Sequence, residues 1–249
     1  MMQQQKELWI DTRLNQEEMD YLHTAISEEN KESFLNKLAG NISKSEKIKD
    51  KDNWFFKSVL KKLTERMFYR DWDNFSKYHI EVEEGIPLPE FEMNRFWVNY
   101  MKQHEFNPIH DHIGLYSFVI FMKIPTHWKE QHALPFSANS NEPRASDFEF
   151  VVGEANGQVY KTSFPLSPED EGRMLFFPAW LQHQVFPFYG TEEERVTISG
   201  NIRLCVPNRS NEYEEKEKIL KMLENSVEVT KEQLKWMKKE GVNDGKTLD

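Results

Sequence analysis

Apolar residues in the first third of the chain recur at helical spacing. Asn15 and Glu18 stand in the arrangement of a capping box, directly ahead of a first apolar stripe. A second stripe predicts an amphipathic helix over about residues 53–69, and the polar stretch of residues 43–52 separates the two. Two N-terminal helices are therefore expected, and we expect their apolar faces to pack on a sheet.

From about residue 93 the apolar period changes to two, which is typical of half-buried strands. Phe96, Val98 and Tyr100 alternate with Trp97, Asn99 and Met101. Further strands are predicted over residues 112–123, 147–154, 158–164, 173–178, 183–188 and 195–205. Asn156-Gly157, between two of these segments, is a typical hairpin turn. The pattern predicts an all-β core with added helices.

Residues 126–146 show no period and contain several prolines and asparagines, so they are a candidate active-site lid. Past Pro207 helical spacing returns. The expected organisation is a helical region over residues 1–90 that buttresses a β-domain over residues 91–206, followed by a helical tail over residues 207–249.

Composition narrows the class of protein. The 249 residues are 38% hydrophobic and 13% aromatic, enough to fill one large core, and the formal charge of −10 argues against a nucleic-acid partner. A single cysteine, Cys205, excludes a framework of intrachain disulfides. No apolar window is long enough to span a bilayer, and the first residues lack a signal-peptide core. We therefore expect a cytoplasmic protein in a reducing compartment, with no membrane partner.

Three histidines are candidates for one metal site. His110 and His112 would project from the same face of a strand, because successive side chains alternate, and Asp111 would point away. His183 follows an apolar run that ends in Phe-Phe-Pro. The alternative is that the pair consists of solvated residues near a strand start, since a lone histidine is more often structural than a ligand.

Arg195 opens a segment in which polar and apolar residues alternate. Thr197 and Ser199 share its face, whereas Val196 and Ile198 occupy the other. This polar face either meets water or lines a cavity.

The order of these residues along the chain resembles that of the iron(II)/2-oxoglutarate-dependent dioxygenases. It consists of a histidine pair, a distal histidine after a Gly-x-x-x-Phe-Phe-Pro strand, and then an arginine. The resemblance covers roughly residues 93–206. It implies a double-stranded β-helix, a jelly-roll barrel like that of the cupins, that binds Fe(II), 2-oxoglutarate and dioxygen. The implied reaction is the hydroxylation of a substrate with release of succinate and carbon dioxide.

The resemblance also implies roles for individual residues. His110, His112 and His183 would bind the metal, with His112 standing where the family usually has an acid. Arg195 would hold the distal carboxylate of 2-oxoglutarate, assisted by a hydroxyl of Thr197 or Ser199. Two choices stay open. Asp111 is the rival ligand to His112 if the strand is bulged, and Tyr100 is the rival to Asn99, which we favour as a further co-substrate contact.

Two other classes of function remain. A cupin-type isomerase would keep the metal without 2-oxoglutarate, although the glutamate expected four to six residues after the histidine pair is replaced by Tyr116, Ser117 and Phe118. A non-catalytic barrel would bind metal weakly. In the oxygenase reading the substrate is a small molecule or a protein side chain, and the helical tail could mediate a homodimer.

Overall fold

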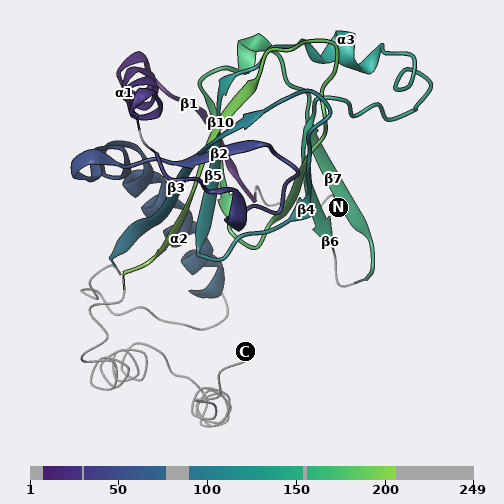
Figure 1. Ribbon diagram of the computed structural model, residues 1–249. Helices are drawn as coiled ribbons and strands as arrows, with labels where there is room; N and C mark the ends of the chain where they lie inside the picture. The colour runs from purple at the N-terminus through teal and green to yellow at the C-terminus, as the bar shows by residue number, and fades with distance from the viewer. Residues whose placement is uncertain (1–7, 30, 77–89, 154–155, 206–249) are drawn as a thin grey trace, which may run out of the picture. The chain divides into compact units, whose positions relative to one another are not determined.

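The computed structural model of the 249-residue chain describes residues 8–29, 31–76, 90–153 and 156–205. The chain divides into two compact units, and both sheets belong to the unit formed by Met1–Thr64 and Phe91–Leu204 (Figure 1). The other unit comprises Glu65–Glu90 and Cys205–Asp249. The helical tail predicted over residues 207–249 lies outside the described residues.

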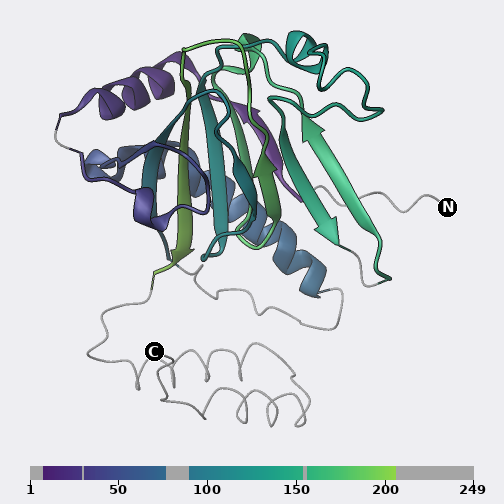
Figure 2. The same ribbon diagram turned by 45° about the vertical axis from the view of Figure 1, so that its right-hand side comes forward.

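Two antiparallel sheets form the core of the first unit, as Figure 2 shows. The larger sheet has the order β1 (Ile10–Arg13), β8 (Arg173–Pro178), β5 (Tyr116–Lys123), β10 (Arg195–Leu204), β3 (Phe91–Met101) and β2 (Lys44–Lys47). The smaller sheet has the order β4 (Asn107–His110), β9 (Gln182–Val185), β6 (Phe148–Gly153) and β7 (Val159–Phe164). The predicted β core with a few helices is therefore confirmed.

The inner faces of the two sheets share one apolar cluster. Its buried members are Val119, Phe121, Ile124, Phe148, Phe150, Phe164, Leu166, Leu175, Phe177 and Leu181. Strands β5 and β8 of the larger sheet and strands β6 and β7 of the smaller one supply seven of them, and Ile124, Leu166 and Leu181 come from the connections. Half of the set is phenylalanine, and the large buried area of these rings stabilises the packing of sheet on sheet.

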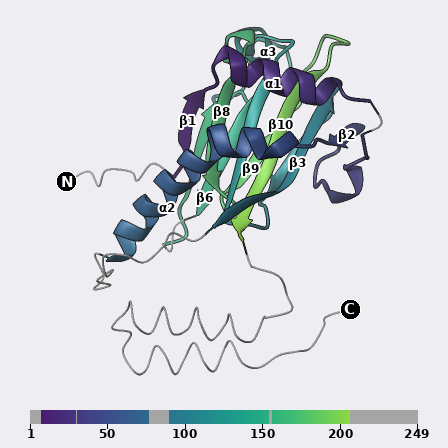
Figure 3. The same ribbon diagram turned by 90° about the vertical axis from the view of Figure 1, so that its left-hand side faces the viewer.

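Helix α1 and the aromatic residue that precedes a π-helical turn pack on the outer face of the larger sheet (Figure 3). Helix α1 (Gln16–Ser27) begins at the predicted capping box, in which the Asn15 side chain accepts from Glu18 N–H. A π-helical turn, η3 (Phe56–Leu60), continues into α2 (Lys61–Ser76). Just before that turn, the ring of Phe55 packs on Phe96 and Phe118 of the sheet. A third, short helix, α3 (Trp128–His132), lies within the segment 126–146.

The N-terminal region contributes more than the predicted helices. Strands β1 and β2 add one edge each to the larger sheet, and a 3-10 turn, η1 (Leu35–Lys37), precedes β2. The region predicted as helical over residues 1–90 therefore also contains two strands that the sequence did not reveal. Two further 3-10 turns, η2 (Lys51–Asn53) and η4 (Pro168–Asp170), complete the described elements. No helix in the described part of the chain is long and apolar enough to cross a membrane.

Candidate functional site

Three imidazoles meet at one point between the sheets. One potential ligand atom from each of His110, His112 and His183 lies within 4.8 Å of the others. The ring centroids are 4.2 to 5.1 Å apart. Asp111 is exposed and is not part of this group. The structure thus brings together the three histidines that the sequence singled out.

The route by which His112 reaches the group differs from the prediction. The strand expected over residues 112–123 begins only at Tyr116, so His112 lies in the loop between β4 and β5 and not on a common strand with His110. His112 N–H donates to Ala179 O over 2.8 Å, which ties this loop to the turn after β8. Gly114, with φ at 145°, permits the bend that follows.

The smaller sheet positions the other two histidines. His110 at the end of β4 pairs directly with His183 in β9, so their side chains lie on the same face. His183 was predicted to start a strand over residues 183–188, whereas β9 spans Gln182–Val185. Rings of Phe177 and Phe148 pack around His183, with centroids 4.9 and 5.6 Å away. These contacts leave His183 only 4% exposed.

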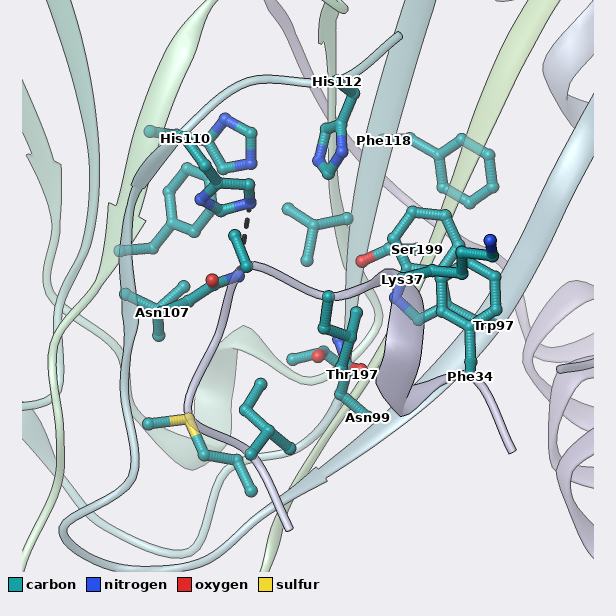
Figure 4. Close-up of a pocket in the computed structure, with 18 of the residues that line it drawn as sticks. Phe34, Lys37, Trp97, Asn99, Asn107, His110, His112, Phe118, Thr197 and Ser199 are labelled. Atoms are coloured by element: carbon teal, nitrogen blue, oxygen red, sulfur yellow. Dashed lines mark hydrogen bonds between the residues drawn. The ribbon is translucent and has the colours of Figure 1, made fainter. Parts of the chain in front are cut away.

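Backbone hydrogen bonds select the tautomer of two imidazoles. His110 Nδ1–H donates to Pro108 O over 2.7 Å, and His183 Nδ1–H donates to Leu181 O over 2.9 Å. Because a carbonyl oxygen can only accept, the lone pair of each ring is assigned to Nε2. Asn107 Nδ2 donates to that lone pair on His110 (Figure 4). The two rings therefore present Nε2 in the form that binds a metal.

All three imidazoles are held neutral. Burial lowers the pKa of His110, and burial, then His110 and then Arg95 lower the pKa of His112 to about 3. Burial and the two neighbouring imidazoles lower the pKa of His183 well below its usual value. Since only a neutral imidazole can donate its lone pair, the group is ready to bind a cation at neutral pH.

A cavity of about 240 Å³ contains this group. Inward residues of both sheets line it, together with Phe34, Lys37, Leu38, Ala39 and Ile42. No residue of the segment 126–146, the predicted lid, is among its lining residues. The wall that sequence reasoning missed is the stretch 34–42, which has no periodic pattern to reveal it. The volume is slightly below the roughly 300 to 1,000 Å³ typical of drug-sized ligands, so the cavity suits small molecules.

Arg195 lines the same cavity and is 1% exposed. Its Nη2 donates to the backbone O of Ser146 over 2.9 Å and to the Ser146 hydroxyl. Among the described residues, Nε and Nη1 of Arg195 have no hydrogen-bond partner. Burial lowers the pKa of the guanidinium to about 10, so it remains charged at neutral pH. A buried cation with two unpaired donors is well suited to a carboxylate ligand.

The residues predicted beside Arg195 also line the cavity. Thr197 and Ser199 face it from β10, and Asn99 faces it from β3, as Figure 4 shows. The Ser45 hydroxyl donates to Asn99 Oδ1 over 2.7 Å, which orients this amide. Tyr100, the rival of Asn99, is not a lining residue, and Lys44 Nζ lies over its ring. The alternation along β3 thus presents Asn99 to the cavity.

Comparisons with known proteins were made for the whole chain. Residues 95–201 match a family model described as "Putative 2OG-Fe(II) oxygenase". Similar solved structures include a prolyl-4-hydroxylase from Pseudomonas putida, 12% identical, with 79% of this chain and 92% of that chain covered and a TM-score of 0.42. Another is an oxidoreductase of the 2OG-Fe(II) oxygenase family from Burkholderia pseudomallei, 14% identical, with a TM-score of 0.33.

The alignment with the Burkholderia pseudomallei structure covers 47% of each chain, so this protein spans about half the length of that relative. No curated protein matches the chain. The family match includes His110, His112, His183 and Arg195. Residues 95–201 thus match a model of the same superfamily that the histidine motif and the arginine indicated.

Proposed function

We propose that the protein is an Fe(II)- and 2-oxoglutarate-dependent oxygenase that hydroxylates a substrate and releases succinate and carbon dioxide. One observation carries the proposal. Three neutral imidazoles converge in the same cavity as a buried arginine that has two unpaired N–H donors. The first feature suits a divalent metal, and the second suits the distal carboxylate of 2-oxoglutarate.

The donor set fits ferrous iron. His110, His112 and His183 would hold the ion through three neutral imidazole nitrogens, which are borderline ligands suited to Fe(II). When bound, iron supplies the redox chemistry with dioxygen and 2-oxoglutarate.

The chain's own residues would bind, orient and shield the reactants. Arg195 would pair with the distal carboxylate of 2-oxoglutarate through Nε and Nη1, while Ser146 holds its third nitrogen. Hydroxyls of Thr197 or Ser199 and the amide of Asn99 line the same space and would add hydrogen bonds. The aromatic packing around His183 would exclude bulk water from the metal, which strengthens electrostatic interactions there.

We assign the two sheets to a double-stranded β-helix barrel, in agreement with the family match. A homodimer through the tail and a cytoplasmic location stay predictions, as does the expectation that nucleic acid is not a partner. A cupin-type isomerase is disfavoured because Tyr116, Ser117 and Phe118 stand where its glutamate would be.

Iron binding and co-substrate turnover test the proposal together. Under anaerobic conditions the full chain should bind about one Fe(II), and on exposure to oxygen it should convert 2-oxoglutarate to succinate. His183→Ala should lose both properties, whereas His23→Ala, which removes an exposed histidine of α1, should keep them. Metal binding without succinate formation would favour an isomerase or a non-catalytic barrel, and full iron occupancy in His183→Ala would remove this site.

A further inference from the structure

One end of the cavity carries hydrogen-bond donors that the proposed reaction does not use. Trp97 lines the cavity and is 3% exposed, with its ring 5.8 Å from that of His112. Its Nε1–H is buried and has no partner among the described residues. An indole nitrogen can only donate, and a buried donor without a partner destabilises the protein. A ligand that accepts this hydrogen bond would remove that destabilisation.

Arg95 lies beside Trp97. Residues 95, 97 and 99 of β3 share one face, because strand side chains alternate, and all three line the cavity. Within the described ranges, Arg95 has no hydrogen-bond or ion-pair partner. Its positive charge therefore has no protein counter-charge.

This end is separate from the one that holds Arg195. In the pairing of β3 with β10, Arg95 is opposite Asn201, and Met101 is opposite Arg195. Arg95 and Met101 are six residues apart on an extended strand, which corresponds to about 20 Å. A single dicarboxylate anchored at Arg195 would therefore leave Arg95 and Trp97 free for another molecule.

The charge around this end favours an anion. Lys37 of η1 is exposed and lines the cavity on the same side as Trp97, as Figure 4 shows. Its neighbour Phe34 stacks on the Trp97 ring, with the centroids 4.8 Å apart. The cavity lining contains three cationic side chains (Lys37, Arg95 and Arg195), and its acid is the exposed Asp111.

We propose that the prime substrate carries an oxyanion group, a carboxylate or a phosphate monoester, that Arg95, the Trp97 Nε1–H and Lys37 bind at this end of the cavity. This inference rests on the proposed function in one respect, which is that the bound anion is called the substrate of the oxygenase. An anchor beside His112 would place the adjoining carbon atoms of the substrate next to the histidine group.

The Trp97 indole provides a direct readout in the full-length, metal-free protein. Its N–H resonance can be assigned in a proton–nitrogen correlation spectrum by comparison with Trp97→Phe. Acetate and methyl phosphate, the two probes, should shift this resonance downfield in a saturable way at constant ionic strength, since an unpaired donor gains an acceptor. Acetamide, the neutral counterpart of acetate, should not. The probe that binds more tightly identifies the class of oxyanion.

Matched variants locate the binding group. Arg95→Gln should weaken the tighter probe at least about tenfold, the effect of one charge-assisted hydrogen bond. Lys37→Gln should weaken it about two- to fivefold, because an exposed cation contributes less. Lys161→Gln, the control, removes an exposed lysine of β7 and should change nothing. Arg195→Gln should keep the Trp97 response.

Three results would overturn the proposal: no anion-specific shift of Trp97, an unchanged affinity in Arg95→Gln, or loss of the response in Arg195→Gln. The last would assign anion binding to the co-substrate end alone. Because these titrations contain neither iron nor 2-oxoglutarate, their result is independent of succinate formation. A protein that forms succinate but shows no Trp97 response would refute this subsite and leave the oxygenase proposal intact.

Discussion

Replacing Arg195 with methionine separates its two contributions, to ligand binding and to folding. Methionine keeps the unbranched stem and removes the charge, so Arg195→Met deletes the guanidinium without opening a large void. In the native protein this group is 1% exposed, with Nη2 bonded to Ser146 and with Nε and Nη1 unpaired. The variant should therefore lose affinity for 2-oxoglutarate without losing its fold.

The size of the binding effect follows from the two unpaired nitrogens. A hydrogen bond to a charged group contributes about 1.5 to 3 kcal/mol, so the loss of two amounts to roughly 3 to 6 kcal/mol. That range corresponds to a dissociation constant for 2-oxoglutarate that is about 10²- to 10⁴-fold weaker. Anaerobic calorimetry on the Fe(II)-loaded protein measures it directly, and iron occupancy should be unchanged.

The free energy of unfolding of Arg195→Met should rise or stay the same, although the affinity for 2-oxoglutarate falls. Without 2-oxoglutarate, the native protein buries a guanidinium that is only partly hydrogen-bonded, so its removal relieves a desolvation cost that the bonds to Ser146 only partly offset. Urea unfolding of Arg195→Met should therefore give an equal or higher free energy of unfolding. Arg203→Met removes an exposed arginine of the same strand that pairs with Glu92. This control should leave the 2-oxoglutarate affinity unchanged and lower the free energy of unfolding by no more than about 1 kcal/mol. Unaltered 2-oxoglutarate affinity in a folded Arg195→Met would refute the assignment.

Three further predictions concern the ligand set, the sheet and the pH dependence of stability. His112→Asp should retain iron and 2-oxoglutarate turnover, since it restores the acid usual in the family. Asp111→Ala should leave iron occupancy unchanged. Loss of iron in Asp111→Ala alone would make Asp111 the ligand. Gly200→Ala should lower the free energy of unfolding in urea by about 1 to 3 kcal/mol, because the added Cβ would lie 2.6 Å from the Phe118 ring and 2.7 Å from Arg95 O. An unchanged free energy of unfolding would show that the sheet relaxes there. Burial raises the pKa of the Asp147 carboxyl to about 6, against roughly 3.9 in the unfolded chain. Because the folded state holds this proton more tightly, the resulting contribution to the free energy of unfolding is fully present below the unfolded pKa and is lost as pH rises through 6. Asp147→Asn should remove this component, so its stability relative to the native protein should rise by up to about 3 kcal/mol between pH 3.5 and pH 7.5, and a pH-independent difference would contradict it.

The alternation of apolar and polar residues predicted most of the core strands, because the apolar positions are the buried ones. Segments predicted at 158–164, 173–178 and 195–205 correspond closely to β7, β8 and β10. Strands β1 and β2 were missed because they form the two edges of the larger sheet, and β2 reads Lys-Ser-Glu-Lys. Such a strand exists because β3 offers it hydrogen-bond partners, and no local apolar pattern records that pairing.

The histidine group was predicted through a premise that holds only in part. Alternation along one strand was expected to align His110 with His112, but β4 ends at His110. The two rings converge because a loop tied to Ala179 turns His112 back toward β9. The spacing of the motif therefore predicted which histidines lie together, while tertiary contacts determine their geometry.

The residues at the far end of the cavity lay beyond sequence reasoning for a different reason. Arg95 and Trp97 read as ordinary members of an alternating strand, and Lys37 as part of a polar connection. Their significance comes from what they lack. The folded structure is needed to show that, among the described residues, the indole N–H is buried without an acceptor and the guanidinium has no ion-pair partner.

Charge balance links the unusual ligand at position 112 to the anionic substrate. Three neutral imidazoles leave the two positive charges of Fe(II) uncompensated, whereas the usual acid would cancel one. The two negative charges of 2-oxoglutarate would offset the metal, and Arg195 would then add one positive charge to the cavity. With Arg95, Lys37 and the exposed Asp111 included, the loaded site would keep a net positive charge. The charge of Arg195 is buried and therefore poorly screened. An anionic substrate would lower this electrostatic energy, so the absence of a ligand carboxylate and the free donors beside His112 favour the same class of substrate.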